Sequence, residues 1–230
     1  MQSEALETLF GGAAGGGKSH GQLLDALRFA VCCPGSRQLM LRRTMPELER
    51  SLVPAALRLY PQCIATYKVS EHRWDFTNGS ALEFGYCDAE SDVTKYQSAE
   101  YDVIRFDELT HFTESQFTYL ISRIRGTNGF PKQIKATTNP GGVGHQWVKA
   151  RFIDSMPPDT MHEFDGGTRL FLPAKLMRAM RNGCGCSPLP TARRCSTACG
   201  SLMTDSISRN FPARCTLSSR MTSQRSGGGI

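Results

Sequence analysis

The feature that most constrains this chain is a glycine-rich segment near its N-terminus, residues 12–19, which reads Gly-Ala-Ala-Gly-Gly-Gly-Lys-Ser. The segment fits the pattern G-x-x-x-x-G-K-[ST] in full and follows the short apolar run Leu9-Phe10. Apolar residues then recur at helical spacing, in Leu23, Leu24, Leu27 and Ala30. A strand, a glycine-rich turn and a helix in this order form a loop whose backbone N–H groups can surround phosphate groups at the positive end of the helix.

Such a loop gives each of its residues a predicted role. Lys18 would reach the β- and γ-phosphates of a nucleotide and act in catalysis, and the Ser19 hydroxyl would bind Mg²⁺. A flexible glycine loop that matches the pattern by accident is the plain alternative, which the strand–loop–helix context disfavours. The expected cofactors are therefore ATP and Mg²⁺. The nucleotide would contact the whole loop, namely Gly12, Ala13, Ala14, Gly15, Gly16, Gly17, Lys18 and Ser19.

An acid pair further along the chain supplies the second half of such a site. The apolar run 103–106 reads as a strand, and Asp107-Glu108 follows it directly. Asp107 would enter the magnesium shell, and Glu108 would orient and deprotonate the attacking water. Acid pairs after apolar runs are also common in surface turns, but the preceding glycine loop and the intervening strand–helix units favour the catalytic role. The pair predicts an ATPase rather than a kinase.

Two further sets of residues are candidates for this site. Thr137, Thr138 and Asn139 end a predicted strand, where they could sense the γ-phosphate, although a simple Asn-Pro turn explains them equally well. Hydrolysis also needs a cation to neutralise the charge that develops on the transferred phosphoryl group. An arginine in this chain is more often a surface or helix-end residue, but four are placed after a strand or a helix near the expected site: Arg42, Arg43, Arg123 and Arg125.

Predicted strands and helices alternate along the chain as far as residue 176. This alternation predicts an α/β fold, a P-loop NTPase with a mostly parallel sheet and helices on both faces. A hairpin is expected within 67–84, because Asn78-Gly79 separates two strand-like runs. We expect other strands at 9–10, 38–41, 101–106, 133–137 and 169–172, and helices from 23 to about 34, at 46–59, at 114–125 and at 147–152.

Composition narrows the possible classes of protein. No apolar run approaches the length of a membrane span and no signal peptide is visible, so we expect a cytosolic protein without membrane contact. The nine cysteines contain no CxxC pair and no usual zinc spacing. The net charge of +6 comes from Met177–Ile230, which carries eight arginines and the single acid Asp205, and it gives little support for DNA binding. That segment lacks hydrophobic periodicity, and we expect a disordered tail such as a frame-shifted translation would produce.

Taken in order, several motifs between about Glu7 and Leu176 resemble the large subunit of tailed-phage terminases. The resemblance implies an ATPase that drives double-stranded viral DNA into the capsid, in the cytoplasm of the infected bacterial host. It also implies a homo-oligomeric ring on the portal protein, a small terminase subunit as a further partner, and a coupling role for Thr137–Asn139. The motifs are Phe10–Ser19, Leu41–Thr44, Phe106–Thr110, Thr138–Gly142, Gly144–Lys149 and Leu172–Leu176.

The sequence departs from the family's pattern in four places. The chain begins close to its first strand, so residues 1–176 are expected to form an N-terminally shortened ATPase domain. Arg105 stands where a small or apolar residue is usual, and a charge in a buried strand is expected to be costly. Ser98 stands where glycine is usual. Beyond Leu176 neither the usual continuation nor a carboxylate cluster appears, so we expect no nuclease domain and no nuclease activity from this chain.

Two other interpretations stay open. The chain could be another P-loop DNA translocase or a helicase, but no helicase-type motif follows the acid pair. It could instead be an inactive remnant or fragment that binds nucleotide weakly, an interpretation that Arg105 and the arginine-rich tail favour. Titration of the purified protein with nucleotide separates a remnant from a working enzyme.

Overall fold

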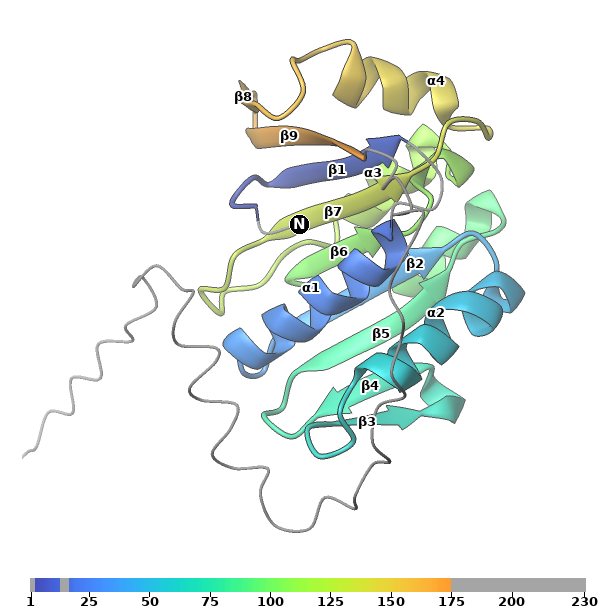
Figure 1. Ribbon diagram of the computed structural model, residues 1–230, viewed down its shortest axis with the longest axis vertical. Helices are drawn as coiled ribbons and strands as arrows, with labels where there is room; N and C mark the ends of the chain where they lie inside the picture. Colours follow the sequence, from blue (N-terminus) through green and yellow to red (C-terminus); the bar gives the residue numbers. More distant parts are fainter. Residues whose placement is uncertain (1–2, 13–16, 175–230) are drawn as a thin grey trace, which may run out of the picture. The chain divides into compact units, whose positions relative to one another are not determined.

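The computed structural model describes residues 3–12 and 17–174 of the chain (Figure 1). Its strands form one sheet in the order β3-β4-β5-β2-β6-β7-β1-β9-β8. The elements are β1 (Glu7–Gly12), α1 (Lys18–Cys32), β2 (Arg37–Arg42), α2 (Met45–Leu59), β3 (Ala65–Lys68), β4 (Arg73–Phe76), β5 (Ala81–Tyr86), β6 (Val103–Phe106), α3 (Glu114–Ile121), β7 (Gln133–Thr138), α4 (His145–Val148), β8 (Met161–Phe164) and β9 (Gly167–Ala174).

The middle of the sheet is parallel and its two edges are antiparallel. Strands β5, β2, β6, β7, β1 and β9 pair in parallel, whereas β3, β4 and β8 join through antiparallel pairs. Parallel strands need crossover connections, and the helices of those connections cover the sheet, so the central strands are buried on both faces. Every residue of β6 and β7 is buried, which confirms the predicted α/β class with a mostly parallel sheet.

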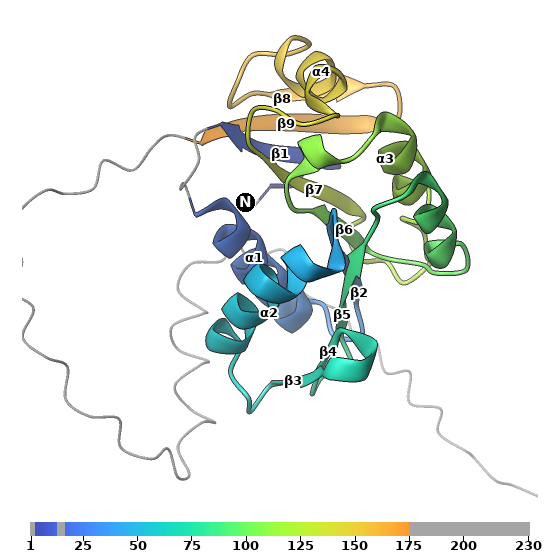
Figure 2. The ribbon, with the colours of Figure 1, turned by 90° about the vertical axis from the view of Figure 1, so that its right-hand side faces the viewer.

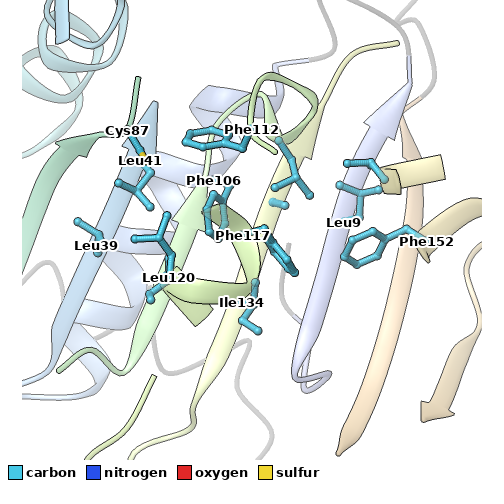
Figure 3. Close-up of a cluster of buried hydrophobic side chains, with 14 of the residues drawn as sticks. Leu9, Leu39, Leu41, Cys87, Phe106, Phe112, Phe117, Leu120, Ile134 and Phe152 are labelled. Carbon is cyan, nitrogen blue, oxygen red and sulfur yellow. The ribbon is translucent and has the colours of Figure 1, made fainter. Parts of the chain in front are cut away.

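Helices cover both faces of the sheet, as predicted (Figure 2). On one face, α1 and α2 pack Leu23, Ala26, Leu48 and Leu52 against the sheet. On the other face, α3 and the segments around it form a second cluster with the strands. Figure 3 shows this cluster, which includes Leu9, Leu39, Leu41, Cys87, Phe106, Phe112, Phe117, Leu120, Ile134 and Phe152.

Local sequence signals explain where two of the helices begin. Thr44 precedes α2, and its side chain accepts a hydrogen bond from the backbone N–H of Glu47. Thr113 and Gln116 form a reciprocal capping box at the start of α3. These side chains satisfy backbone donors that have no partner within the first turn of a helix.

The structure corrects several of the predicted boundaries. Helix α3 ends at Ile121 rather than Arg125, because the chain after it turns back until Ile124 forms a bridge with Tyr101. The helix predicted at 147–152 is the short α4 continued by a π-helix at Lys149–Ile153. The edge strands β3 and β8 were not predicted, whereas the β4–β5 hairpin does turn at Asn78-Gly79.

Some predictions fall outside the described residues. Ala13, Ala14, Gly15 and Gly16 of the glycine loop lie there, and so does the predicted tail, Met177–Ile230. Among the residues that the structure describes, no helix is long and apolar enough to cross a membrane.

Candidate functional site

The predicted site residues meet where β1, β6 and β7 end and α1 begins. These three strands are neighbours in the sheet, so their carboxyl ends lie side by side. The described ends of the glycine loop, Gly12 and Gly17, have φ angles of 122° and 67°. Such angles favour glycine, and a Cβ atom on Gly12 would lie only 2.9 Å from the Ala174 carbonyl oxygen. The backbone therefore has positive φ angles where it enters and leaves this loop, and glycine is the residue that adopts them readily.

Asp107 lies at the centre of the first group of side chains. Its Oδ1 accepts hydrogen bonds from Ser19 Oγ (2.7 Å) and Thr137 Oγ1 (2.8 Å), and its Oδ2 accepts one from Arg42 Nη1 (2.9 Å). The Asp107 side chain is fully buried, so the three hydrogen bonds offset the cost of burying its charge. A hydroxyl and a carboxylate at this separation are the hard oxygen donors that Mg²⁺ prefers, so Ser19 and Asp107 fit the predicted metal role.

Asn139 joins the second group. Lys18 Nζ donates to Asn139 Oδ1 at 2.7 Å. The side-chain amide of Asn139 donates to Glu108 Oε1 at 2.5 Å, and its backbone N–H donates to Glu108 Oε2 at 3.1 Å. One asparagine thus connects the expected phosphate-binding lysine to the expected general base.

Glu108 has an uncommon backbone conformation. Its φ and ψ angles are 62° and 61°, the left-handed region that side chains with a Cβ atom rarely adopt. Such strain is local, persists only when neighbouring contacts hold it, and concentrates at active sites. In this chain the contacts with Asn139 and a hydrogen bond from the Glu108 backbone N–H to Thr137 Oγ1 (3.4 Å) hold the residue.

The three predicted coupling residues lie inside this arrangement. Thr137 contacts Asp107, and Asn139 contacts Lys18 and Glu108, so a simple Asn-Pro turn does not account for them. Thr138 Oγ1 donates to Thr110 Oγ1 at 3.1 Å, and Thr110 in turn donates to the Asn139 carbonyl. The end of β7 is therefore bonded to the segments on both sides of Glu108.

The segment after Asn139 packs tightly on the segment after Glu108. The Gly144 backbone N–H donates to the Thr110 carbonyl at 2.8 Å, and Trp147 Nε1 donates to the Phe112 carbonyl at 3.0 Å. A Cβ atom on Gly144 would lie 2.3 Å from the Phe112 oxygen, so this approach requires glycine. The glycine run that follows the Asn-Pro turn thus has a packing role that the sequence did not reveal.

The four candidate arginines lie in different places. Arg42 contacts the site, because it bonds Asp107 and also Ser51 Oγ at 2.7 Å. Arg43 bonds Asp88 and the His111 carbonyl. Arg123 bonds the Gln97 carbonyl and Arg125 pairs with Glu100 at 3.4 Å. Within the described residues, Arg42 is the one candidate that the structure brings to Asp107, and it comes from the same chain.

Two contacts near the site were missed by the sequence reasoning. Gln22 on α1 is fully buried and donates to the Phe106 carbonyl at 2.9 Å, directly before Asp107. The ion pair between Arg42 and Asp107 was also missed, although the signal was present. Arg42 ends β2 and Asp107 follows β6, and these strands are parallel neighbours in the sheet, so the two side chains meet at one edge.

Comparisons with known proteins identify a family for this chain. The family model described as phage terminase large subunit matches residues 4–180. No match is found among curated proteins.

Similar solved structures come from phages. The large terminase of a thermophilic bacteriophage is 17% identical with a TM-score of 0.59, over 74% of this chain and 40% of that one. A variant of the large terminase ATPase domain of Thermus phage P74-26 is 14% identical with a TM-score of 0.51, over 75% of this chain and 77% of that domain. The N-terminal domain of the DNA packaging ATPase of bacteriophage phi29 is 16% identical with a TM-score of 0.51, over 73% of this chain and 90% of that domain.

These likenesses show the fold, which is that of the P-loop NTPase domains of terminases. The chain spans 40% of the length of the first of these terminases. The match of the family model covers most of the chain and includes every predicted site residue. The chain therefore belongs to the phage terminase large subunit family.

Proposed function

We propose that this chain hydrolyses ATP with Mg²⁺ as the motor domain of a phage DNA-packaging terminase. The observation that carries the proposal is that Ser19 meets Asp107, and that Asn139 contacts both Lys18 and Glu108, at the ends of adjacent strands. The thermophilic-phage large terminase described above has also been solved in complex with ADP and with ATP-γ-S, which supports nucleotide binding by a domain of this fold.

Each residue of the site has a defined task in this proposal. Lys18 would exchange its contact with Asn139 for the β- and γ-phosphates, and the backbone N–H groups of a loop of this sequence pattern would bind the same phosphates. Ser19 and Asp107 would hold Mg²⁺, which would supply positive charge to offset that of the phosphates. Arg42 forms an ion pair with one oxygen of Asp107. The position of the Arg42 side chain would therefore respond to metal binding at that carboxylate.

Glu108 is the general base of the proposed reaction. Its carboxylate accepts the proton of a water molecule that attacks the γ-phosphate, and both its oxygens are oriented by Asn139. Release of Lys18 from Asn139 on nucleotide binding changes the surroundings of the base at the same time. Through this exchange Asn139 couples the presence of a γ-phosphate to the placement of Glu108.

The proposal extends to the partners that the family membership supports. Double-stranded DNA is the translocated substrate, and the portal protein and the small terminase subunit are partners in the cytoplasm of the infected bacterial host. Several copies work as a homo-oligomeric ring, in which an arginine from one copy, Arg42, Arg43, Arg123 or Arg125, reaches the nucleotide of the next. Residues 1–176 form the ATPase domain, and the nuclease activity of the family is not expected from this domain.

The test is nucleotide binding and phosphate release by the purified chain. We expect ATP to bind, Mg²⁺ to be required for phosphate release, and double-stranded DNA to stimulate the release. A chain that binds ATP weakly and releases no phosphate under any of these conditions is the inactive remnant instead. DNA unwinding in place of stimulated release on intact duplex would identify a helicase.

A further inference from the structure

A second layer of charged side chains lies beneath the site and joins the same three elements. Arg105 of β6 and Lys135 of β7 are fully buried, and both bind Asp25 of α1. Arg105 Nη1 and Lys135 Nζ each lie 2.6 Å from the same oxygen, Asp25 Oδ2. Arg105 is indeed buried in a strand, as the sequence suggested, and a carboxylate on the facing helix pairs with its charge.

The register of the strands stacks this layer under the catalytic one. Arg105 and Lys135 are direct partners in the pairing of β6 with β7. Asp107 and Thr137 stand two residues further along each strand, and alternate residues of a strand point to the same face. In the upper layer Ser19 and Thr137 share one oxygen of Asp107, and in the lower layer Arg105 and Lys135 share one oxygen of Asp25.

Two glutamines complete the connection between helix and sheet. Gln22 stands between Ser19 and Asp25 on α1 and donates to the Phe106 carbonyl, so it links the two layers. Gln38 of β2 accepts from Arg105 Nε (3.1 Å) and Nη2 (2.8 Å), and its own amide donates to the Ala26 carbonyl. The guanidinium group of Arg105 is thus held by fixed, directional contacts on two sides.

Stability alone does not explain such a layer. Burying ions costs desolvation energy, and well-packed apolar residues of similar volume are often as stabilising or more so. What the ions can add is geometry, because charge-assisted hydrogen bonds are directional as well as strong. The helix held in this way begins with Lys18 and Ser19, and the strands held with it end at Asp107 and Thr137.

We infer that Asp25, Arg105 and Lys135 are positioning residues that fix α1 on β6 and β7, and thereby set the separation of Ser19 from Asp107. The inference rests on the proposed function, since it concerns the distance between the two groups that would hold Mg²⁺. None of these three residues is among those proposed to bind the nucleotide or Mg²⁺. It acts through the register of the helix that carries the phosphate-binding residues.

The experiment replaces the whole layer by apolar residues of similar size, with the substitutions Asp25→Leu, Gln38→Leu, Arg105→Met and Lys135→Met. Calorimetry then measures the affinity for ATP-γ-S with and without Mg²⁺, and phosphate release measures turnover. We expect this variant to melt no lower than the parent, since buried ionic groups can be exchanged for apolar ones. We expect its gain in affinity from Mg²⁺ to fall about tenfold and its turnover to fall between about tenfold and a hundredfold, because small displacements at reacting groups are costly.

The control is a matched ionic cluster that does not touch α1. The buried carboxylate of Glu7 lies between Arg151 and Arg169, at 2.7 Å from each, and joins β1 to β9 and the π-helix. Glu7→Gln should lower stability while leaving the gain in affinity from Mg²⁺ and the turnover within about twofold of the parent, because it removes a buried ionic contact elsewhere.

If the four-site variant fails to fold, Asp25→Glu decides the question, because it keeps the charge but lengthens the side chain by one methylene. The same loss of the Mg²⁺-dependent gain in Asp25→Glu supports the inference. A folded variant of either kind with the parent's gain and turnover overturns it and leaves the proposed function standing. A parent that binds no ATP-γ-S with or without Mg²⁺ overturns the proposed function, and the inference with it.

Discussion

Both carboxylate oxygens of Glu108 accept hydrogen bonds from Asn139, one from its side-chain amide and one from its backbone N–H. The remaining polar atom of the asparagine side chain accepts from Lys18, so the base and the phosphate-binding lysine are tied through a single residue. The left-handed backbone at Glu108 is consistent with a side chain that must be held in one direction.

Asn139→Ala tests this relationship. The substitution removes the side-chain contacts with both Lys18 and Glu108 but leaves the phosphate-binding loop intact. Turnover is expected to fall between about tenfold and a hundredfold because the base loses its orientation, while ATP affinity changes little. Asn128→Ala, at an asparagine bonded to Asp102 away from the site, should leave turnover unchanged. Equal turnover in the Asn139 variant and the parent would show that Glu108 does not need the asparagine.

Lys18→Ala is expected to remove most of the affinity for ATP. The lysine is the mobile cation of the loop, and the phosphates would lose a charge-assisted contact. Filter binding or calorimetry with ATP-γ-S measures the loss. Lys68→Ala removes a lysine from the edge strand β3 and should bind like the parent. Undiminished binding in the Lys18 variant would refute the assignment of the phosphate site.

Glu108→Gln is expected to bind ATP but not to turn it over, since an amide does not take a proton from water. Asp107→Asn should instead weaken the effect of Mg²⁺ on binding, because it changes a metal ligand. Measuring Mg²⁺-dependent affinity and phosphate release in both variants separates the two roles. Hydrolysis that survives in Glu108→Gln and stops in Asp107→Asn would mean that the base is assigned wrongly.

Arg105→Met alone is expected to destabilise the fold, by about 3 kcal/mol, because breaking a buried pair leaves its partners unsatisfied. The sequence alone favours the opposite result, since a charge in a core strand is costly when nothing pairs with it. Urea unfolding provides the measurement. Arg125→Met is a suitable control, because Arg125 and Glu100 form an exposed pair whose loss costs about 0–1 kcal/mol. A more stable Arg105 variant would show that the pairing with Asp25 does not offset desolvation.

The lowered pKa of Lys135 makes the stability of the fold depend on pH. Burial, with the neighbouring Arg105, lowers the pKa of Lys135 to about 8 from its ordinary 10.5, although Asp25 opposes the shift. Between these pH values the unfolded chain binds more protons than the folded one, so this lysine makes the fold more stable as pH rises from 8. The groups that face it are Asp25 and Arg28 from α1 and Arg105 from β6.

The measurement compares the parent with Lys135→Met by urea unfolding at pH 7.5 and 9.5. Burial raises the pKa of Cys87 to about 11, which lowers stability above pH 9, but this term is common to both proteins and cancels. Between pH 7.5 and 9.5 the unfolding free energy of the parent should rise by about 2 kcal/mol relative to that of Lys135→Met. A difference that does not move, or moves the other way, would contradict the lowered pKa of Lys135.

Much of the fold was predictable because its signals are local. The glycine loop, the apolar strands and the alternation with helices are readable within short windows, and the carboxyl ends of parallel strands necessarily meet. Because these strand ends meet, the sequence could place four residues close together: Lys18, Ser19, Asp107 and Glu108. The edge strands β3 and β8 were missed because they are short, and their mostly exposed residues give them little hydrophobic pattern.

The rest of the site depends on contacts between distant residues. Nothing within α1 marks Asp25 as the partner of Arg105, eighty positions away in the sequence, and the pairing became visible only with the register of β6 and β7. The left-handed backbone of Glu108 has no local cause either, since no residue type at that position demands it. The π-helix at Lys149–Ile153 was indistinguishable from an α-helix, because both place apolar residues on one side over so short a length.

The most direct test of the proposed ATPase site is phosphate release from ATP by the purified chain, measured with and without Mg²⁺ and compared with Glu108→Gln under the same conditions. We expect phosphate release that requires Mg²⁺ and disappears in the variant, while the parent and the variant bind ATP-γ-S equally well. Release by the variant at the parent's rate, or no release by a parent that binds Mg²⁺ and ATP-γ-S, would contradict the proposed site.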